Sequence, residues 1–126
     1  MKKELVIKTC TKCGATVEVL KDCTCENCGI KCCGETMTTV LPNTVDASVE
    51  KHKPVIEIVG SYVVASVPHV MEEEHYIEWI GMEGNGTIGK KYFTAGSNPK
   101  AIFPYVPNST IYAYCNKHGL WSTIVE

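Results

Sequence analysis

The chain carries four histidines and one isolated cysteine that together could bind a metal ion. These residues are His52, His69, His75, His118 and Cys115. Imidazole nitrogens suit iron, and a thiolate adds electron density and a negative charge. Ferrous iron with four neutral imidazoles and one thiolate would have a net charge of +1 and would keep a sixth position open. Such a site would attract a small anion.

The local sequence around these residues supports a shared site. Cys115 and His118 lie in the segment CNKHG, where Asn116 and Gly119 allow a sharp turn, so this pair can chelate one ion. Lys51 is adjacent to His52 and would strengthen the attraction for an anion. A single histidine would more often be a surface or core residue. The presence of all four beside an isolated cysteine favours a metal centre.

A second group of candidate ligands lies near the N-terminus, where seven cysteines fall between Cys10 and Cys33. Cys10 and Cys13 have the spacing of a hairpin clamp for a tetrahedral metal. The second pair could be Cys25 and Cys28, as in a zinc ribbon, or the adjacent residues 32 and 33. Spacing alone does not choose between them. Cys23 is left over in either case, and the surplus cysteines could be free thiols or a redox pair.

Composition limits the class of protein. The 126 residues include 44% hydrophobic and 21% charged residues, and the formal net charge is -2. No cluster of Lys and Arg predicts nucleic-acid binding. The apolar stretch 55–67 is interrupted by Glu57, Gly60 and Ser61 and is too short to span a membrane. The start MKKELVIKTC does not have the pattern of a signal peptide, so we expect a cytoplasmic protein, in which clustered cysteines favour metal binding over disulfides.

The sequence predicts a mainly β protein with two domains, 1–38 and 39–126. The first has one expected strand, at 16–20, and too little apolar material to fold without a metal. The second has short strands expected within 55–67 and at 75–80, 89–94, 101–106, 111–114 and 120–125, separated by turn signals, which is typical of an antiparallel sandwich. Strict alternation would place Ile77 and Trp79 on one face and Ile80 on the other.

The N-terminal residues carry a family resemblance. The segments CTKCG, VEVL and CCGETM resemble desulforedoxin and the N-terminal domain of desulfoferrodoxins. The resemblance implies a rubredoxin-like iron centre with four thiolate ligands, Cys10, Cys13, Cys32 and Cys33, where zinc is an alternative metal. The loop between the two pairs looks longer than is typical and has cysteines where the family usually has glycines.

The remaining motifs resemble the catalytic domain of superoxide reductases. They are EKHKPV, PHVMEEEHYIEWI and YCNKHGLW, in the family order. The resemblance implies an immunoglobulin-like sandwich and an iron with four equatorial histidines, His52, His69, His75 and His118, and an axial Cys115. It also implies that Glu50 can occupy the sixth position of the ferric form, and that Lys51 assists substrate binding and protonation.

The activity implied by both resemblances is the one-electron reduction of superoxide to hydrogen peroxide. Electrons would come from an external donor such as rubredoxin, and the protein would be a homodimer that serves oxygen defence. Two rival hypotheses stay open at this point. One is an electron carrier whose histidine-bound iron is only a relay, and the other is a zinc-binding interaction module on a β-sandwich.

Overall fold

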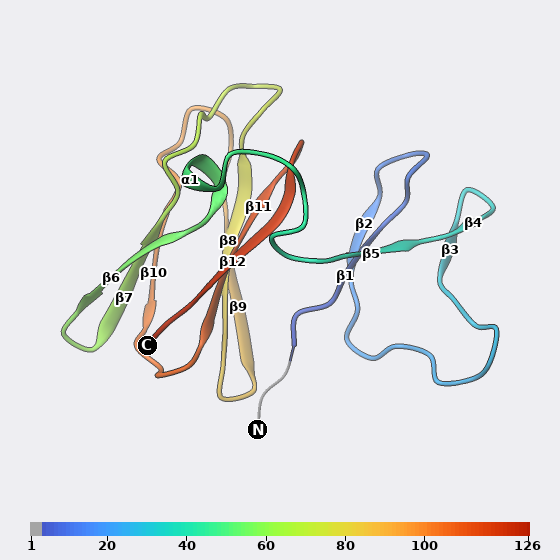
Figure 1. Ribbon diagram of the computed structural model, residues 1–126, viewed down its shortest axis with the longest axis horizontal. Coiled ribbons are helices and arrows are strands. Elements are labelled where there is room, and N and C mark those ends of the chain that lie inside the picture. Colours follow the sequence, from blue (N-terminus) through green and yellow to red (C-terminus); the bar gives the residue numbers. More distant parts are fainter. Residues whose placement is uncertain (1–3) are drawn as a thin grey trace. The chain divides into compact units, whose positions relative to one another are not determined.

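The computed structural model of the chain describes residues 4–126, which divide into two compact units, residues 4–41 and residues 42–126 (Figure 1). We refer to them as the small unit and the sandwich unit. The small unit extends to Leu41, because strand β5 (Thr38–Val40) pairs with β1 (Ile7–Thr9). No described helix is long and apolar enough to cross a membrane.

The small unit consists of a three-stranded sheet and a hairpin. The sheet has the order β2-β1-β5, in which β2 is Thr16–Glu18, and the hairpin joins β3 (Lys31–Cys32) to β4 (Glu35–Thr36). Its buried apolar side chains are few: Leu5, Ile7, Cys10, Val19 and Met37. A core this small provides little hydrophobic stabilisation, so a bound metal is expected to contribute to folding.

The sandwich unit is built from seven antiparallel strands in two sheets (Figure 1). One sheet has the order β10-β7-β6 and the other β12-β11-β8-β9. The strands are β6 (Val55–Val59), β7 (Tyr62–Ser66), β8 (Ile77–Gly84), β9 (Thr87–Tyr92), β10 (Lys100–Pro104), β11 (Thr110–Cys115) and β12 (Gly119–Ile124). Two antiparallel sheets of three and four strands are the architecture of an immunoglobulin-like sandwich, which confirms the predicted fold class.

The core of the sandwich unit comes from alternating residues of these strands. Val63 and Ala65 of β7 are fully buried, as are Ile111 and Ala113 of β11. The long apolar stretch 55–67 is a hairpin of two strands that turns at Gly60, whose φ of 60° favours glycine. The Asn85–Gly86 turn likewise joins β8 to β9 with positive φ at both residues.

The predicted alternation along β8 is wrong at its start. Ile77 and Ile80 both belong to the core, whereas Trp79 stacks on Tyr114 with ring centroids 5.7 Å apart. The cause is a bulge: Tyr114 pairs with Trp79, but the next residue, Cys115, pairs with Ile77. The unpaired extra residue reverses the faces of the strand.

Four segments converge at one end of the sandwich unit (Figure 1). They are the single-turn helix α1 (Val49–His52), the loop from β7 to β8, the end of β11 and the turn from β11 to β12. The candidate ligands of the histidine group all lie in these segments.

Candidate metal centres

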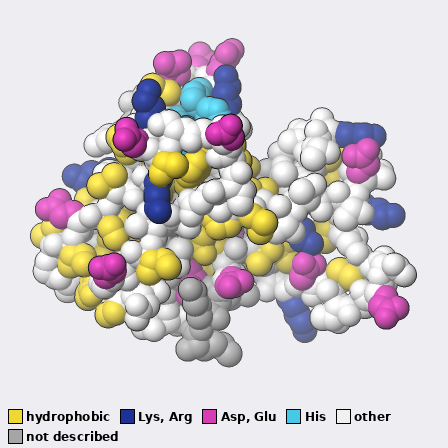
Figure 2. Space-filling view, in the orientation of Figure 1, with side chains coloured by type: hydrophobic (Ala, Val, Ile, Leu, Met, Phe, Trp, Pro, Cys, Tyr) yellow, Lys and Arg dark blue, Asp and Glu magenta, His cyan; other side chains and the backbone are white. Residues whose placement is uncertain are grey.

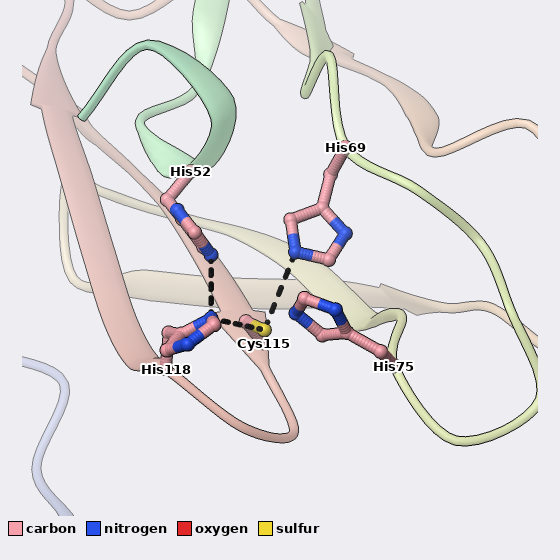
Figure 3. Close-up of side chains that lie close together, drawn as sticks. All are labelled: His52, His69, His75, Cys115 and His118. Carbon is pink, nitrogen blue, oxygen red and sulfur yellow. Dashed lines mark hydrogen bonds between the residues drawn. The ribbon is translucent and has the colours of Figure 1, made fainter. Parts of the chain in front are cut away.

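The structure brings His52, His69, His75, Cys115 and His118 together. Each offers one ligand atom, and these atoms all lie within 4.8 Å of one another. Figure 3 shows the four rings and the thiol pointing toward a common centre. Cys115 and His52 are buried, and the other three side chains are partly buried. Five potential ligands from separate segments therefore surround a space that solvent reaches only in part.

Backbone carbonyls fix the orientation of two of these rings. Nδ1 of His52 lies 2.7 Å from the carbonyl oxygen of Ser48, and Nδ1 of His69 lies 2.5 Å from that of Val70. A carbonyl oxygen only accepts, so each Nδ1 must carry the proton. With a single proton on each ring, the Nε2 that faces the site is the unprotonated nitrogen. Such bonds from the outer nitrogen are what orients histidine ligands of metals.

The inner atoms form contacts that a metal ion could replace. Nε2 of His52 lies 3.0 Å from Nδ1 of His118, and Nε2 of His69 lies 3.4 Å from Sγ of Cys115. In the tautomer with the single ring proton on Nδ1 of His52 and of His69, His118 and Cys115 are the donors in these contacts. Nε2 of His75 is buried without a hydrogen-bond partner among the described residues. A metal cation between these atoms would replace both contacts and would also give Nε2 of His75 a partner. Four imidazole nitrogens and one sulfur are donors that suit iron.

Burial sets the charge that these groups prefer. It is the main cause that lowers the pKa of His69 and of His75 below the ordinary 6.5, and neighbouring imidazoles act in the same direction. Burial also raises the pKa of the Cys115 thiol. Burial therefore favours the neutral form of His69 and His75 that a metal ligand needs, whereas a thiolate at Cys115 needs a nearby cation to form.

Asn116 holds two ligand-bearing segments together. Its Oδ1 accepts a hydrogen bond from the backbone N of Tyr76 at 3.0 Å, and its Nδ2 donates to the carbonyl of Glu74 at 2.9 Å. Its backbone N donates to the Tyr76 carbonyl at 3.2 Å. The segment of His75 is therefore attached to the turn of Cys115. Sequence reasoning assigned Asn116 only a turn geometry, because its partners are some 40 residues away.

Trp121 supports the site from the core side. It is 2% exposed, and its indole N–H donates to the carbonyl of His118 at 3.1 Å. Its ring also stacks on His52. Trp121 is therefore a packing residue whose packing partner is a candidate ligand.

The two residues predicted to act on substrate lie at the surface. Glu50 and Lys51 are exposed on helix α1, beside the buried His52. The structure does not include the carboxylate of Glu50 in the ligand cluster. Figure 2 shows histidine side chains reaching the surface, with acidic and basic side chains around them.

The second cluster lies in the small unit and consists of Cys10, Cys13, Cys32 and Cys33, whose ligand atoms are also within 4.8 Å of one another. Two turns present them. Gly14, with φ 80°, donates its backbone N–H to the Cys10 carbonyl and closes the first turn. Cys33 and Gly34, with φ 55° and 77°, form the turn between β3 and β4. The structure thus brings the adjacent cysteines 32 and 33 together with the Cys10–Cys13 pair.

The protons of this cluster are shared unequally. Backbone hydrogen bonds, chiefly at Cys13, lower the pKa of Cys10 to about 7. Hydrogen bonds from Cys13 and Cys10 raise the pKa of Cys32 to about 12. A thiolate therefore forms most easily at Cys10, while Cys32 and Cys33 hold their protons more tightly. A metal cation would stabilise all four thiolates, and four sulfur donors suit iron or zinc.

The zinc-ribbon alternative is wrong for this chain, because Cys28 forms a disulfide with Cys23. Cys25 is a free, exposed thiol. The surplus cysteines are therefore outside both clusters, and the redox-pair alternative fits two of them.

Comparison with known proteins agrees with the geometry. Residues 44–124 match the family model described as desulfoferrodoxin. A desulfoferrodoxin of Syntrophotalea carbinolica is 41% identical over 98% of each chain. The superoxide reductase structure from Treponema pallidum aligns with a TM-score of 0.71 and 28% identity, over 96% of this chain and 99% of that one. A superoxide reductase (neelaredoxin) structure from Archaeoglobus fulgidus has a TM-score of 0.55 and 29% identity, over 68% of this chain and 96% of that one.

This chain belongs to the desulfoferrodoxin family. The four-histidine, one-cysteine cluster and the four-cysteine cluster are consistent with the iron centres of that family.

Proposed function

We propose that the chain is a superoxide reductase that acts at the four-histidine, one-cysteine site. The observation that carries this proposal is the convergence of four imidazoles and one thiol with all ligand atoms within 4.8 Å of one another. The structural similarity to superoxide reductases supports the same activity. The ligands of the iron would be His52, His69, His75, His118 and Cys115.

The reaction combines one superoxide anion, one electron and two protons to give one hydrogen peroxide. Iron held by the four histidines and Cys115 would supply the electron. The protein supplies the remaining parts: neutral imidazoles that leave the site cationic, a thiolate that donates electron density, and a partly open surface through which a small anion enters.

Lys51 and Glu50 have separate proposed roles. In this proposal the exposed side chain of Lys51, next in sequence to buried His52, attracts the anionic substrate and supplies a proton. Glu50 is the carboxylate on the same helical turn that could fill the open position of the oxidised iron. Both roles are proposals based on the position of helix α1 and on the motif.

The electron that restores ferrous iron comes, in this proposal, from an external donor such as rubredoxin. Cys10, Cys13, Cys32 and Cys33 would hold a second iron in the small unit. We further propose that the working protein is a cytoplasmic homodimer that removes superoxide. Its domain 1–38 would hold the four-cysteine centre, and its domain 39–126 would hold the catalytic centre.

Metal analysis and superoxide oxidation test this function together. We expect about two irons per chain from the two ligand sets. Added superoxide should oxidise the ferrous histidine site and yield one hydrogen peroxide per iron oxidised. An iron that superoxide fails to oxidise would instead favour the electron-carrier hypothesis. One zinc and no iron would favour the interaction module.

Cys115→Ser tests the thiolate ligand, with Cys25→Ser as its matched control. The first change should remove the thiolate absorption of the histidine-bound iron and lower its reaction with superoxide. The second alters an exposed cysteine outside both clusters and should leave both measurements unchanged. If Cys115→Ser behaved like its control, the ligand assignment would be wrong.

A further inference from the structure

Three cysteines lie close together in a loop of the small unit that neither metal cluster uses. Cys23 and Cys28 form a disulfide, and Cys25 lies between them as a free thiol. Every residue from 21 to 28 is exposed, and no strand or helix is formed between β2 and β3. We infer that this loop is a thiol–disulfide exchange site, which takes two electrons from an external dithiol and is distinct from both metal centres.

A purely structural cross-link is poorly supported at this place. The two bridged residues are only 5 positions apart in sequence. The stabilisation that a disulfide gives through chain entropy is smallest for such short loops. Exposed disulfides are also the ones that thiols reduce readily, whereas structural disulfides resist reduction. Position and exposure therefore favour a bond that opens and closes.

The ends of the loop are held independently of the disulfide. Asp22 forms an ion pair with Lys8 of β1, with 3.0 Å between Nζ and Oδ2, and its Oδ1 accepts a hydrogen bond from the backbone N of Cys23. At the other end, the backbone N of Met37 donates to the Ile30 carbonyl at 2.7 Å. The bond can therefore break without releasing the strands that present the four-cysteine cluster.

The external dithiol supplies the two electrons and two protons that the exchange reaction needs. Its thiolate attacks the exposed sulfur of Cys23 or Cys28, the disulfide breaks, and a mixed disulfide forms. The second thiol of the reductant then attacks the mixed disulfide. The reductant leaves as a disulfide, and the loop gains two electrons and two protons.

Cys25 gives the loop an internal partner for exchange. It lies two residues after Cys23 and three before Cys28, so its sulfur can reach either one along the chain. Attack of its thiolate on the disulfide would move the bond to a neighbouring pair without net oxidation or reduction. The Cys25–Cys28 pair has the C-x-x-C spacing found in disulfide oxidoreductases.

A redox titration of the full, metal-loaded chain tests the inference. The protein is equilibrated with mixtures of reduced and oxidised dithiothreitol, its free thiols are alkylated, and it is digested with trypsin. Cleavage after Lys21 and Lys31 releases residues 22–31, which contain Cys23, Cys25 and Cys28 but none of the four cluster cysteines. The number of labels on this peptide therefore reports the loop alone.

We expect the peptide to change from one label to three in a single two-electron step as the dithiol fraction rises. One label at every mixture would identify a fixed structural cross-link and would overturn the inference. Three labels at every mixture would show that no disulfide forms, with the same consequence. The metal content, measured on the same samples, should not change.

Variants extend the test to Cys25. In Cys23→Ser the remaining pair should form a disulfide under oxidising conditions, so its peptide changes from no label to two. If it carried two labels throughout, internal exchange through Cys25 would be excluded. The matched control, Cys25→Ser with Cys28→Ser, leaves a single cysteine and should carry one label at every mixture. Superoxide reduction, measured separately, should stay within about twofold of the parent in each variant, so the exchange site and the proposed function can fail independently.

Discussion

The indole of Trp121 lies nearly parallel to the imidazole of His52, with ring centroids 5.0 Å apart and 24° between the planes. The same indole donates a hydrogen bond to the backbone of His118. One core residue thus positions two candidate ligands that are 66 residues apart in sequence. We therefore expect packing of the sandwich unit and metal binding to be coupled at this contact.

Trp121→Phe should lower the stability of the fold and should change the geometry of the iron site. The stacked ring is kept, but the hydrogen bond to the His118 carbonyl is lost, at a cost of about 1 kcal/mol in the free energy of unfolding. We expect a shifted absorption spectrum of the histidine-bound iron. Trp79→Phe is the matched control: Trp79 stacks on Tyr114 and belongs to neither cluster, so the spectrum should not move. Equal spectra in both variants would contradict the coupling.

Asn116→Ala should weaken iron binding at the histidine site. The change removes the side-chain bonds to Tyr76 and Glu74, which hold the His75 segment against the turn of Cys115. Loss of such supporting contacts typically lowers metal affinity about 10–100-fold. Competition with a chelator measures the change.

The control for this variant is Asn43→Ala, which removes side-chain hydrogen bonds to Ser122 away from the ligands. It should cost stability but leave the iron affinity unaltered. A similar loss of affinity in both variants would show that Asn116 acts only through general stability.

Glu78 should make stability depend on pH. Burial raises the pKa of this carboxyl above the ordinary 4.5. The folded protein then binds a proton more tightly than the unfolded chain, so this contribution is fully present below pH 4.5 and is lost as pH rises through the folded-state pKa. In Glu78→Gln this decline should disappear. Urea unfolding measures the free energy of unfolding of both proteins across the acidic pH range. If the carboxyl had no such effect, the two free energies would change with pH in the same way.

Removal of the metal from the small unit should loosen that unit alone. Its few buried apolar residues cannot replace the four metal–sulfur bonds. After chelation, hydrogen exchange should speed up at the amides of Val19 and Met37, which bond to Val6 and Ile30. The amide of Val125, bonded to Ser109 in the sandwich unit, serves as the internal reference. Equal exchange before and after chelation would mean that the small unit folds without metal.

The sequence allowed the sandwich and the five histidine-site residues to be predicted, because strands and turns leave local signals and the ligand types are chemically distinctive. Long-range hydrogen bonds leave no local signal in the sequence, so the bonds from Asn116 to Tyr76 and Glu74 could not be predicted. The face reversal along β8 was also missed, since a bulge depends on pairing with Cys115 and not on local composition. Cysteine spacing alone left the second ligand pair undecided, and the positive φ of Cys33 shows how an adjacent pair fits a turn.

The ligand-bearing segments lie at one end of the sandwich unit, and the turns at Gly60 and Asn85–Gly86 lie at the other (Figure 1). This separation makes the second end a practical attachment point. A fluorescent dye, an affinity tag or a surface tether placed in either turn would leave the mouth of the metal site unobstructed. Immobilised on an electrode through one of these turns, the protein would present its iron toward the solution, a geometry suited to a superoxide sensor.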